Sequence, residues 1–505
     1  MKAALTYITL LFFLATEVPA QHYDFNNNCK TAYREIINLN FIRARQLIMQ
    51  EKKNQPDNLI AVYLENTIDF LTLVTTENPA TFNTLKSNKE RRLAALEKGD
   101  KHSPYNRYCL AEVHLQWAAA RIIFNEYLTA AYEINRAYRL LDRNHEKFPD
   151  FKPNLKSLGL INALVGTIPD NFRWIARIIG MTGTSEQGVN QMASAMHASL
   201  THEEFDFLLP ETLFLLTFTN LNLLNDEKQL QSLVRIIENN SEINALSQSS
   251  ALINYALANL YMRFKGDNDK ALYVLQNFKG CRQCLPFWYR TYLLGLAKLH
   301  NQDPQAITHF EHFVNNFRGV NNIKSAYQKM AWHYLMQKDT AAYTAYMHKV
   351  TLHGKQYVDA DKVAQAEAEA GVIPNYYLLK ARLLFDGAYY ERALQVLATV
   401  NPETSFKTFK EALEFSYRMG RIYHSLNRET KALSFYQITI DKGWDKTYYY
   451  AANAALHMGY IYENMGDYSK AAASYRQAQN MHNTEYKHSI DQRAKAALNR
   501  ITNER

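Results

Sequence analysis

Small, apolar and aromatic residues recur at helical spacing between Ala452 and Tyr486 and predict two paired helices. The pattern consists of Ala455, Met458, Gly459, Tyr462, Ala471, Tyr475 and Ala478. Because Gly459 and Ala471 have small side chains or none, two antiparallel helices can approach each other closely there. The aromatic rings then fill the space between the two helices and toward the next pair.

The same pattern recurs upstream in a regular register, in which Ala381, Gly420 and Gly459 are evenly spaced along the chain. The two further copies contain Gly420, Tyr423, Ala432 and Tyr436, and Ala381, Leu384, Ala393 and Leu397. Looser copies contain Ala331, Tyr334, Ala342 and Tyr346; Gly295, Ala306, Phe310 and Phe313; and Ala258, Tyr261, Ala271, Leu275 and Phe278. The chain therefore contains an array of helical hairpins.

This spacing resembles the tetratricopeptide repeat, W-x2-L-G-x2-Y followed by A-x3-F, and departs from it at the opening Trp and the closing Pro. Each copy is about five residues longer than the usual 34. The resemblance implies an all-α solenoid that ends in a capping helix at Asp491 to Ile501. We expect an irregular α-helical region over residues 21–245 and the repeat array over residues 246–505.

The N-terminal region shows helical periodicity without a clean repeat, and its stretch from Leu158 to Gly188 is rich in glycine. Glycines there are typical of helix contacts and caps, because no phosphate-binding Gly-Lys-Ser/Thr follows. The order of an apolar glycine-containing helix, an Ile-Pro step, an aromatic helix and a Gly-x-x-Gly turn resembles the eukaryotic tetratricopeptide family of mitochondrial outer-membrane and inclusion-body clearance proteins. That family is intracellular, so its locations and lipid-related roles are not carried over.

The segment before Gln21 resembles a signal peptide. Lys2 precedes an apolar run from Ala3 to Ala15, and small residues lead up to a predicted cleavage before Gln21. An uncleaved anchor is the alternative, although the run is shorter than the about 20 residues that span a bilayer. Polar residues interrupt the later apolar stretches, so we expect no transmembrane span in the mature chain. We predict an exported protein of the bacterial type, in the periplasm or cell envelope.

Composition narrows the function classes. The chain has 505 residues, a formal net charge of +8, 47% hydrophobic and 21% charged residues. Basic and acidic residues are interleaved, which argues against a nucleic-acid footprint. Four cysteines in a chain of this length do not form a disulfide scaffold, although Cys29 and Cys109 could pair.

Cys281 and Cys284 form the sharpest chemical motif, Cys-x-x-Cys. Leu285 stands where haem attachment requires His, and a thioredoxin-type centre needs a βαβ context. A zinc site with His309 and His312 would depart from the usual spacing of zinc ligands. A local disulfide is the preferred interpretation, and we expect no metal and no cofactor.

No hydrolase, P-loop or calcium-loop signature is present, so we predict that the protein is not an enzyme. We predict instead a scaffold that binds a protein or peptide partner through the concave face of the repeats, with no nucleic acid. The residues expected on that face are Arg382, Phe385, Tyr417, Arg421, His424, Tyr460 and Glu463. The alternative is an exported thiol-redox factor or enzyme that uses Cys281 and Cys284. Lipid or small-molecule binding near Leu158 to Gly188 ranks below both.

Overall fold

The protein is all-helical, as the sequence predicts. The computed structural model describes residues 21–168, 180–224 and 226–503. Within these ranges no β-strand occurs, and one isolated bridge pairs His22 with Asn58. The predicted signal segment and part of the glycine-rich stretch lie outside the described residues.

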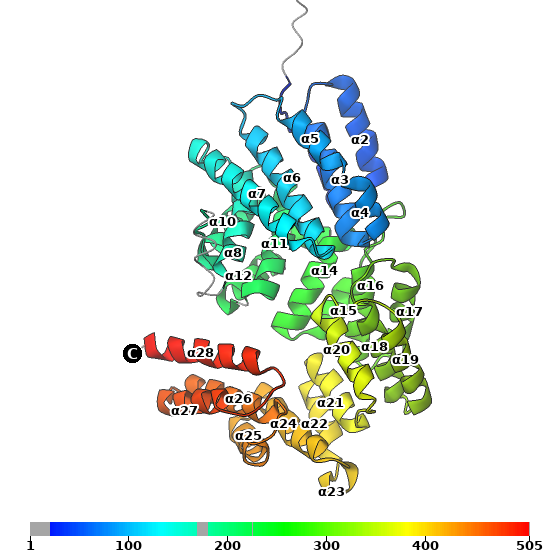
Figure 1. The fold of residues 1–505 in the computed structure, drawn as a ribbon, viewed down its shortest axis with the longest axis vertical. Coiled ribbons are helices and arrows are strands. Elements are labelled where there is room, and N and C mark those ends of the chain that lie inside the picture. The colour runs from blue at the N-terminus through cyan, green and yellow to red at the C-terminus, as the bar shows by residue number, and fades with distance from the viewer. Residues whose placement is uncertain (1–20, 169–179, 225, 504–505) are drawn as a thin grey trace, which may run out of the picture. The chain divides into compact units, whose positions relative to one another are not determined.

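The chain divides into two compact units, which are described separately (Figure 1). Unit 1 contains residues 21–233 and 280–286 of the described chain, and unit 2 contains residues 234–279 and 287–503. The boundary falls within helix α12 (Glu227–Glu238). This boundary separates compact units, whereas the predicted boundary at residue 245 separates the irregular region from the repeats. The latter stays a prediction.

Unit 1 consists of helices joined mostly by short connections. Its elements are α1 (Asn27–Ile37), α2 (Phe41–Asn54), α3 (Ile60–Thr76), α4 (Pro79–Leu85), α5 (Asn88–Leu96), α6 (Pro104–Ile123), α7 (Tyr127–Lys147), α8 (Pro153–Gly166), α10 (Ser185–Thr201), the 3₁₀ turn η2 (Asp206–Leu208), α11 (Leu209–Thr219) and the π-helical turn η3 (Asn220–Leu224). Helices α6 and α7 pack side by side, and so do α8 and α10 (Figure 1).

Glycines set the crossing of α8 and α10. A Cβ at Gly159 would lie 2.6 Å from the carbonyl oxygen of Gly188, and a Cβ at Gly188 would lie 2.5 Å from that of Gly159. The backbones of the two helices are therefore in direct contact. Gly159 and Gly188 are therefore helix-contact residues, as the sequence predicts.

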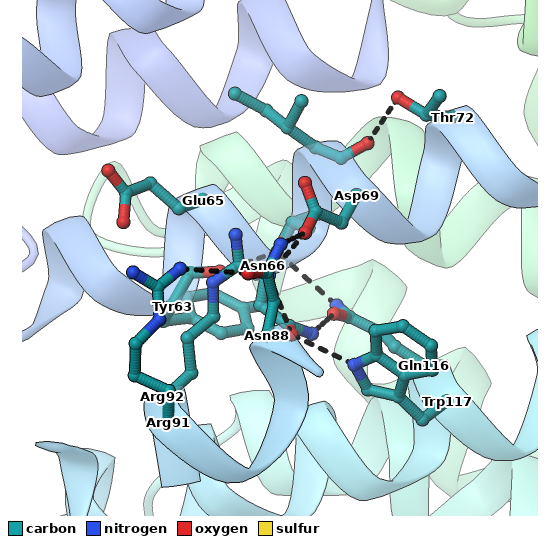
Figure 2. A network of polar contacts seen from close by, with 12 residues as sticks. Tyr63, Glu65, Asn66, Asp69, Thr72, Asn88, Arg91, Arg92, Gln116 and Trp117 are labelled. Carbon is teal, nitrogen blue, oxygen red and sulfur yellow. Dashed lines mark hydrogen bonds and ion pairs between the residues drawn. The ribbon is translucent and has the colours of Figure 1, made fainter. Parts of the chain in front are cut away.

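Buried polar side chains tie α3, α5 and α6 together (Figure 2). Asn66 donates to Oε1 of Gln116 at 2.7 Å, and its Oδ1 accepts from Nε1 of Trp117 at 3.0 Å. Arg92 bonds to the same Oδ1 and forms an ion pair with Asp69 at 2.6 Å. Because buried polar groups are costly when unpaired, this network fixes one arrangement of the three helices.

A second buried network surrounds Lys156, which is fully buried in α8. Its Nζ lies 3.0 Å from Oε2 of Glu112 and 2.7 Å from Oε2 of Glu211. Glu211 belongs to Asp206–Leu224, the one stretch of the described chain that is long and apolar enough to cross a membrane. In the most apolar part of this stretch, 61% is buried inside the structure. The stretch is thus covered and bonded in the way of a core helix.

Unit 2 is a series of helical hairpins. Its elements are α13 (Ser241–Ser249), α14 (Ala251–Leu260), the π-helical turn η4 (Tyr261–Lys265), α15 (Asn268–Gln276), α16 (Trp288–His300), α17 (Ala306–Asn316), α18 (Ile323–Met336), α19 (Thr340–Leu352), α20 (Asp359–Ala370), α21 (Tyr376–Asp386), α22 (Tyr390–Ala398), α23 (Pro402–Ser405), α24 (Phe409–Ser425), α25 (Glu429–Gly443), α26 (Tyr450–Asn464), α27 (Tyr468–Gln479) and α28 (Lys487–Asn503). The three regular copies are the pairs α21–α22, α24–α25 and α26–α27.

The small residue of one helix faces a large residue of its partner in the two C-terminal copies. A Cβ at Gly459 would collide with the ring of Tyr475, and one at Gly420 would lie 2.5 Å from Cδ1 of Tyr436. Both tyrosines are fully buried. The close approach that the sequence pattern predicts is therefore the contact that closes each hairpin.

We expect Gly459→Ala to destabilise the protein by about 1–3 kcal/mol, because the added methyl group overpacks against Tyr475. Helix propensity alone would stabilise this variant by up to about 1 kcal/mol, so the sign is informative. Urea unfolding followed by circular dichroism measures the change. The variant Tyr475→Leu makes room for the methyl group, so the Gly459→Ala penalty should shrink in the double variant. Stability of Gly459→Ala at or above wild type would contradict the close contact.

Candidate functional site

A groove of about 920 Å³ lies within unit 2. Helices α20, α21, α24, α26 and α28 supply most of its lining, and Trp332 of α18 adds an indole ring. In the regular copies it is the first helix of each hairpin, α21, α24 or α26, that faces the groove. The repeat register therefore decides which side chains reach it.

Four of the predicted residues line the groove: Arg382, Phe385, Tyr417 and Arg421. The guanidinium of Arg421 donates to the hydroxyl of Tyr417 at 3.0 Å and lies over the ring of Phe385 at 5.0 Å from its centroid. Among the described residues Arg421 has no carboxylate partner. Its planar charge is held in position by a neighbouring repeat and remains available to an anion.

Arg418, one turn away on α24, is already neutralised. Glu414 accepts from its Nε at 2.7 Å and from the hydroxyl of Tyr450 at 2.9 Å. Burial raises the pKa of Glu414, but the charge and hydrogen bonds of Arg418 outweigh burial and hold the pKa below its usual range. Glu414 therefore stays ionised and neutralises Arg418, which leaves Arg421 as the arginine of α24 without a carboxylate partner among the described residues.

Arg382 and Lys329 stack on the indole of Trp332. The Arg382 guanidinium lies 4.9 Å from the ring centroid and the Lys329 ammonium lies 3.7 Å from it. Arg382 also makes a loose ion pair with Asp386 at 3.8 Å. Burial, assisted by the charge of Arg382, lowers the pKa of Lys329 to about 7. Of these two cations only Arg382 lines the groove, where its guanidinium lies on the indole ring of Trp332.

Asn453 adds a polar group that the sequence analysis missed. Its Nδ2 donates to the Tyr417 hydroxyl at 2.6 Å, while its buried Oδ1 has no donor within the described structure. Asn453 and Glu414 occupy the same position of consecutive repeats, so the repeat register contained the signal that would have found both. Trp332 lies outside the three regular copies and had no such signal.

The other three predicted residues do not line the groove, because their positions are packed. His424 lies behind Arg421 and bonds to the hydroxyl of Tyr436 at 3.3 Å. Glu463 accepts two bonds from Arg500 of α28, at 2.6 and 2.8 Å. Tyr460 is covered by Arg493 of α28, whose guanidinium lies 5.8 Å from the ring centroid. Helix α28 thus covers the face of α26 that a further repeat would cover.

Apolar side chains with substantial exposure line another part of the groove. Val363, Val372 and Ile373 are 39%, 69% and 43% exposed, and all three line the cavity. They belong to α20 and to its connection with α21. The groove therefore offers apolar as well as cationic contacts to an occupant.

Cys281 and Cys284 form a disulfide with each other in the connection between α15 and α16. Cys281 is exposed, and α16 begins only at Trp288. Neither cysteine occupies a helix N-terminus, where a redox thiolate is stabilised, so this placement does not favour the redox alternative. Cys29 and Cys109 are free, buried thiols and do not form the disulfide that the sequence allowed.

Comparison with known proteins identifies the repeat directly. A model of the tetratricopeptide repeat family matches residues 454–485, which fall in α26 and α27 and the segment that follows them. This segment is therefore similar to tetratricopeptide repeats in both sequence and structure. No curated protein matches the chain by sequence.

A solved structure of an IFIT1 monomeric mutant with Gppp-AAAA aligns with 90% of this chain and 95% of its own. The TM-score is 0.33 and the sequence identity is 13%. A similarity this low supports no conclusion about what the present protein binds.

Neutral histidines form the layer behind Arg421. Burial and the charge of Arg421 lower the pKa of His424 to about 4. Burial also holds the pKa of His457, which stacks on Tyr436, well below its usual range. Both rings are therefore uncharged in the folded protein at neutral pH.

We expect unit 2 to lose stability as the pH falls from about 6.5 toward about 4. Over this range the unfolded chain binds a proton at His424 and the folded chain does not, so acid favours unfolding. Urea midpoints measured from pH 8 to 4.5 check this. His424→Gln should flatten the dependence, whereas His488→Gln, at an exposed position, should leave it unchanged. Equal slopes in wild type and His424→Gln would contradict the assignment.

Proposed function

We propose that this protein is a binding scaffold that holds an acidic segment of a protein or peptide partner in the groove of unit 2. Arg421 carries the proposal, because it is fixed by Tyr417 and Phe385 and lacks a carboxylate among the described residues. A partner carboxylate would complete its hydrogen bonds in the bidentate geometry that arginine favours. Helical repeat arrays serve mainly as such binding surfaces.

The apolar part of the groove favours a protein or peptide segment over a bare anion. The exposed Val363, Val372 and Ile373 favour a partner in which bulky apolar residues accompany the acidic ones.

Export to the cell envelope is part of the proposal. It rests on the charged start, apolar run and small residues of positions 1–20. Gln21, the first residue of the proposed mature chain, already takes part in unit 1, because its carbonyl accepts from the amide of Asp100 at 3.0 Å. Removal of the segment before Gln21 would leave this contact in place.

Reversing the two cationic positions, Arg382→Glu with Arg421→Glu, should weaken binding of acidic, apolar-flanked peptides by at least about tenfold. Fluorescence anisotropy against an array of labelled peptides measures the effect. Arg421→Met keeps the packing of the stem and should show part of the loss. The matched control, Lys431→Glu with Arg476→Glu, makes the same charge change at exposed positions outside the groove and should bind normally. Equal binding by the groove variant and wild type would exclude the groove.

Expression with the native N-terminus in a bacterium that has a periplasm should yield a periplasmic product beginning at Gln21. N-terminal sequencing and intact mass measure this directly. Ala20→Arg should block cleavage, because signal peptidase requires a small residue there. A product that begins at Met1 and remains in the cytoplasm would contradict export.

A further inference from the structure

Helix α7 in unit 1 has an exposed face that neither the groove nor the core explains. Its buried residues include Ala130, Ala137 and Leu141. The opposite face carries five exposed residues at intervals of three and four, and these share one side of the helix. They are Leu128, Tyr132, Arg136, Arg139 and Arg143.

The N-terminal part of this face is apolar. Leu128 is 91% exposed and Tyr132 is 60% exposed. Tyr127, at 59%, and Ile122 at the end of α6, at 46%, extend the apolar surface around the α6–α7 turn. These four large, exposed apolar side chains all fall between positions 122 and 132, whereas the exposed apolar residues of ordinary surfaces are mostly isolated.

The three arginines are free of carboxylates in the part of the chain that the structure describes. They stand at i, i+3 and i+7, so each faces a like charge one turn away, a spacing that destabilises an isolated helix. The acidic residues of α7 near them are the buried Glu133, which pairs with Lys89 and His114, the half-buried Asp142 and the exposed Glu146. None of the three forms an ion pair with these arginines within the described residues. Stability of the helix therefore does not explain this row of charges.

We propose that the α7 face, defined as Leu128, Tyr132, Arg136, Arg139 and Arg143, docks onto the surface of a membrane that contains anionic lipid. The three guanidinium groups would bind headgroup phosphates, and Tyr132 would lie at the headgroup level, where tyrosine is enriched. Leu128 would insert at the boundary of the acyl chains. The row is about 22 Å long at 1.5 Å per residue, so one helix presents all five side chains to a flat surface.

The apolar end decides between a lipid surface and a nucleic acid. A nucleic-acid backbone would bind the arginines but would leave an aliphatic side chain as exposed as Leu128 without a partner. A bilayer receives both the charges and the leucine. The inference uses unit 1 alone and is independent of the proposed peptide groove.

Flotation of the full chain with vesicles tests the proposal. Vesicles of phosphatidylcholine in which roughly a third of the lipid is phosphatidylglycerol are compared with vesicles of phosphatidylcholine alone. Any binding through the apolar N-terminal segment is common to both kinds of vesicle, so the readout is the extra binding to the anionic vesicles. The variant Arg136→Glu, Arg139→Glu and Arg143→Glu should lose roughly 100-fold of that extra binding at low salt. Leu128→Ser, which changes no charge, should lose roughly tenfold.

The matched control carries Lys431→Glu, Arg476→Glu and Lys495→Glu, the same change in charge at exposed positions of unit 2. It should bind like wild type, and circular dichroism should show that every variant is folded. Equal losses in the control, or no preference of wild type for anionic vesicles, would overturn the proposal. Binding of a labelled single-stranded oligonucleotide through the same arginines, without vesicle binding, would overturn it in favour of nucleic acid.

Discussion

The close approach of the two helices in each regular hairpin is the constraint on which unit 2 depends. Gly459 meets the ring of Tyr475, and Gly420 meets the ring of Tyr436. In the copy before them, the corresponding positions hold Ala381, which is larger than glycine, and Leu397, which is smaller than tyrosine. Both are buried. The pair keeps a similar total volume in each copy, so the hairpins have similar thickness and their first helices line up along one groove.

Within this arrangement, two arginines of helix α24 have different kinds of partner. Arg418 is neutralised by Glu414 of its own helix, whereas Arg421 is held by Tyr417 and by Phe385 of the preceding repeat. An aromatic ring positions a guanidinium without cancelling its charge. Stacking of repeats thus does more than extend the fold, because it holds a cation in position, and under the proposed function this would lower the entropic cost of binding.

Unit 1 reaches a defined fold by a different route. Its helices are joined by buried polar networks, such as the one that links Asn66, Gln116 and Arg92 (Figure 2). A half-satisfied buried network is worse than an apolar core, so such bonds specify the arrangement of helices strongly. The core of the unit is complete without the exposed face of α7, whose arginines form no ion pair within the described residues.

The sequence by itself determined the helical class, the regular register of the repeats and the small and aromatic residues that close the hairpins, because helical periodicity and local volume are properties of neighbouring positions. It also led to Arg382, Phe385, Tyr417 and Arg421, since the register selects one face of each first helix. Only the tertiary structure decided that His424, Tyr460 and Glu463 are packed away. Arg493 and Arg500 reach Tyr460 and Glu463 from a helix that follows the last repeat, and a pattern within single repeats contains no information about that helix. The unpaired state of Arg421, the lone Oδ1 of Asn453 and the Asn66 network depend likewise on which side chains meet across distances in the chain, and packing alone settles that.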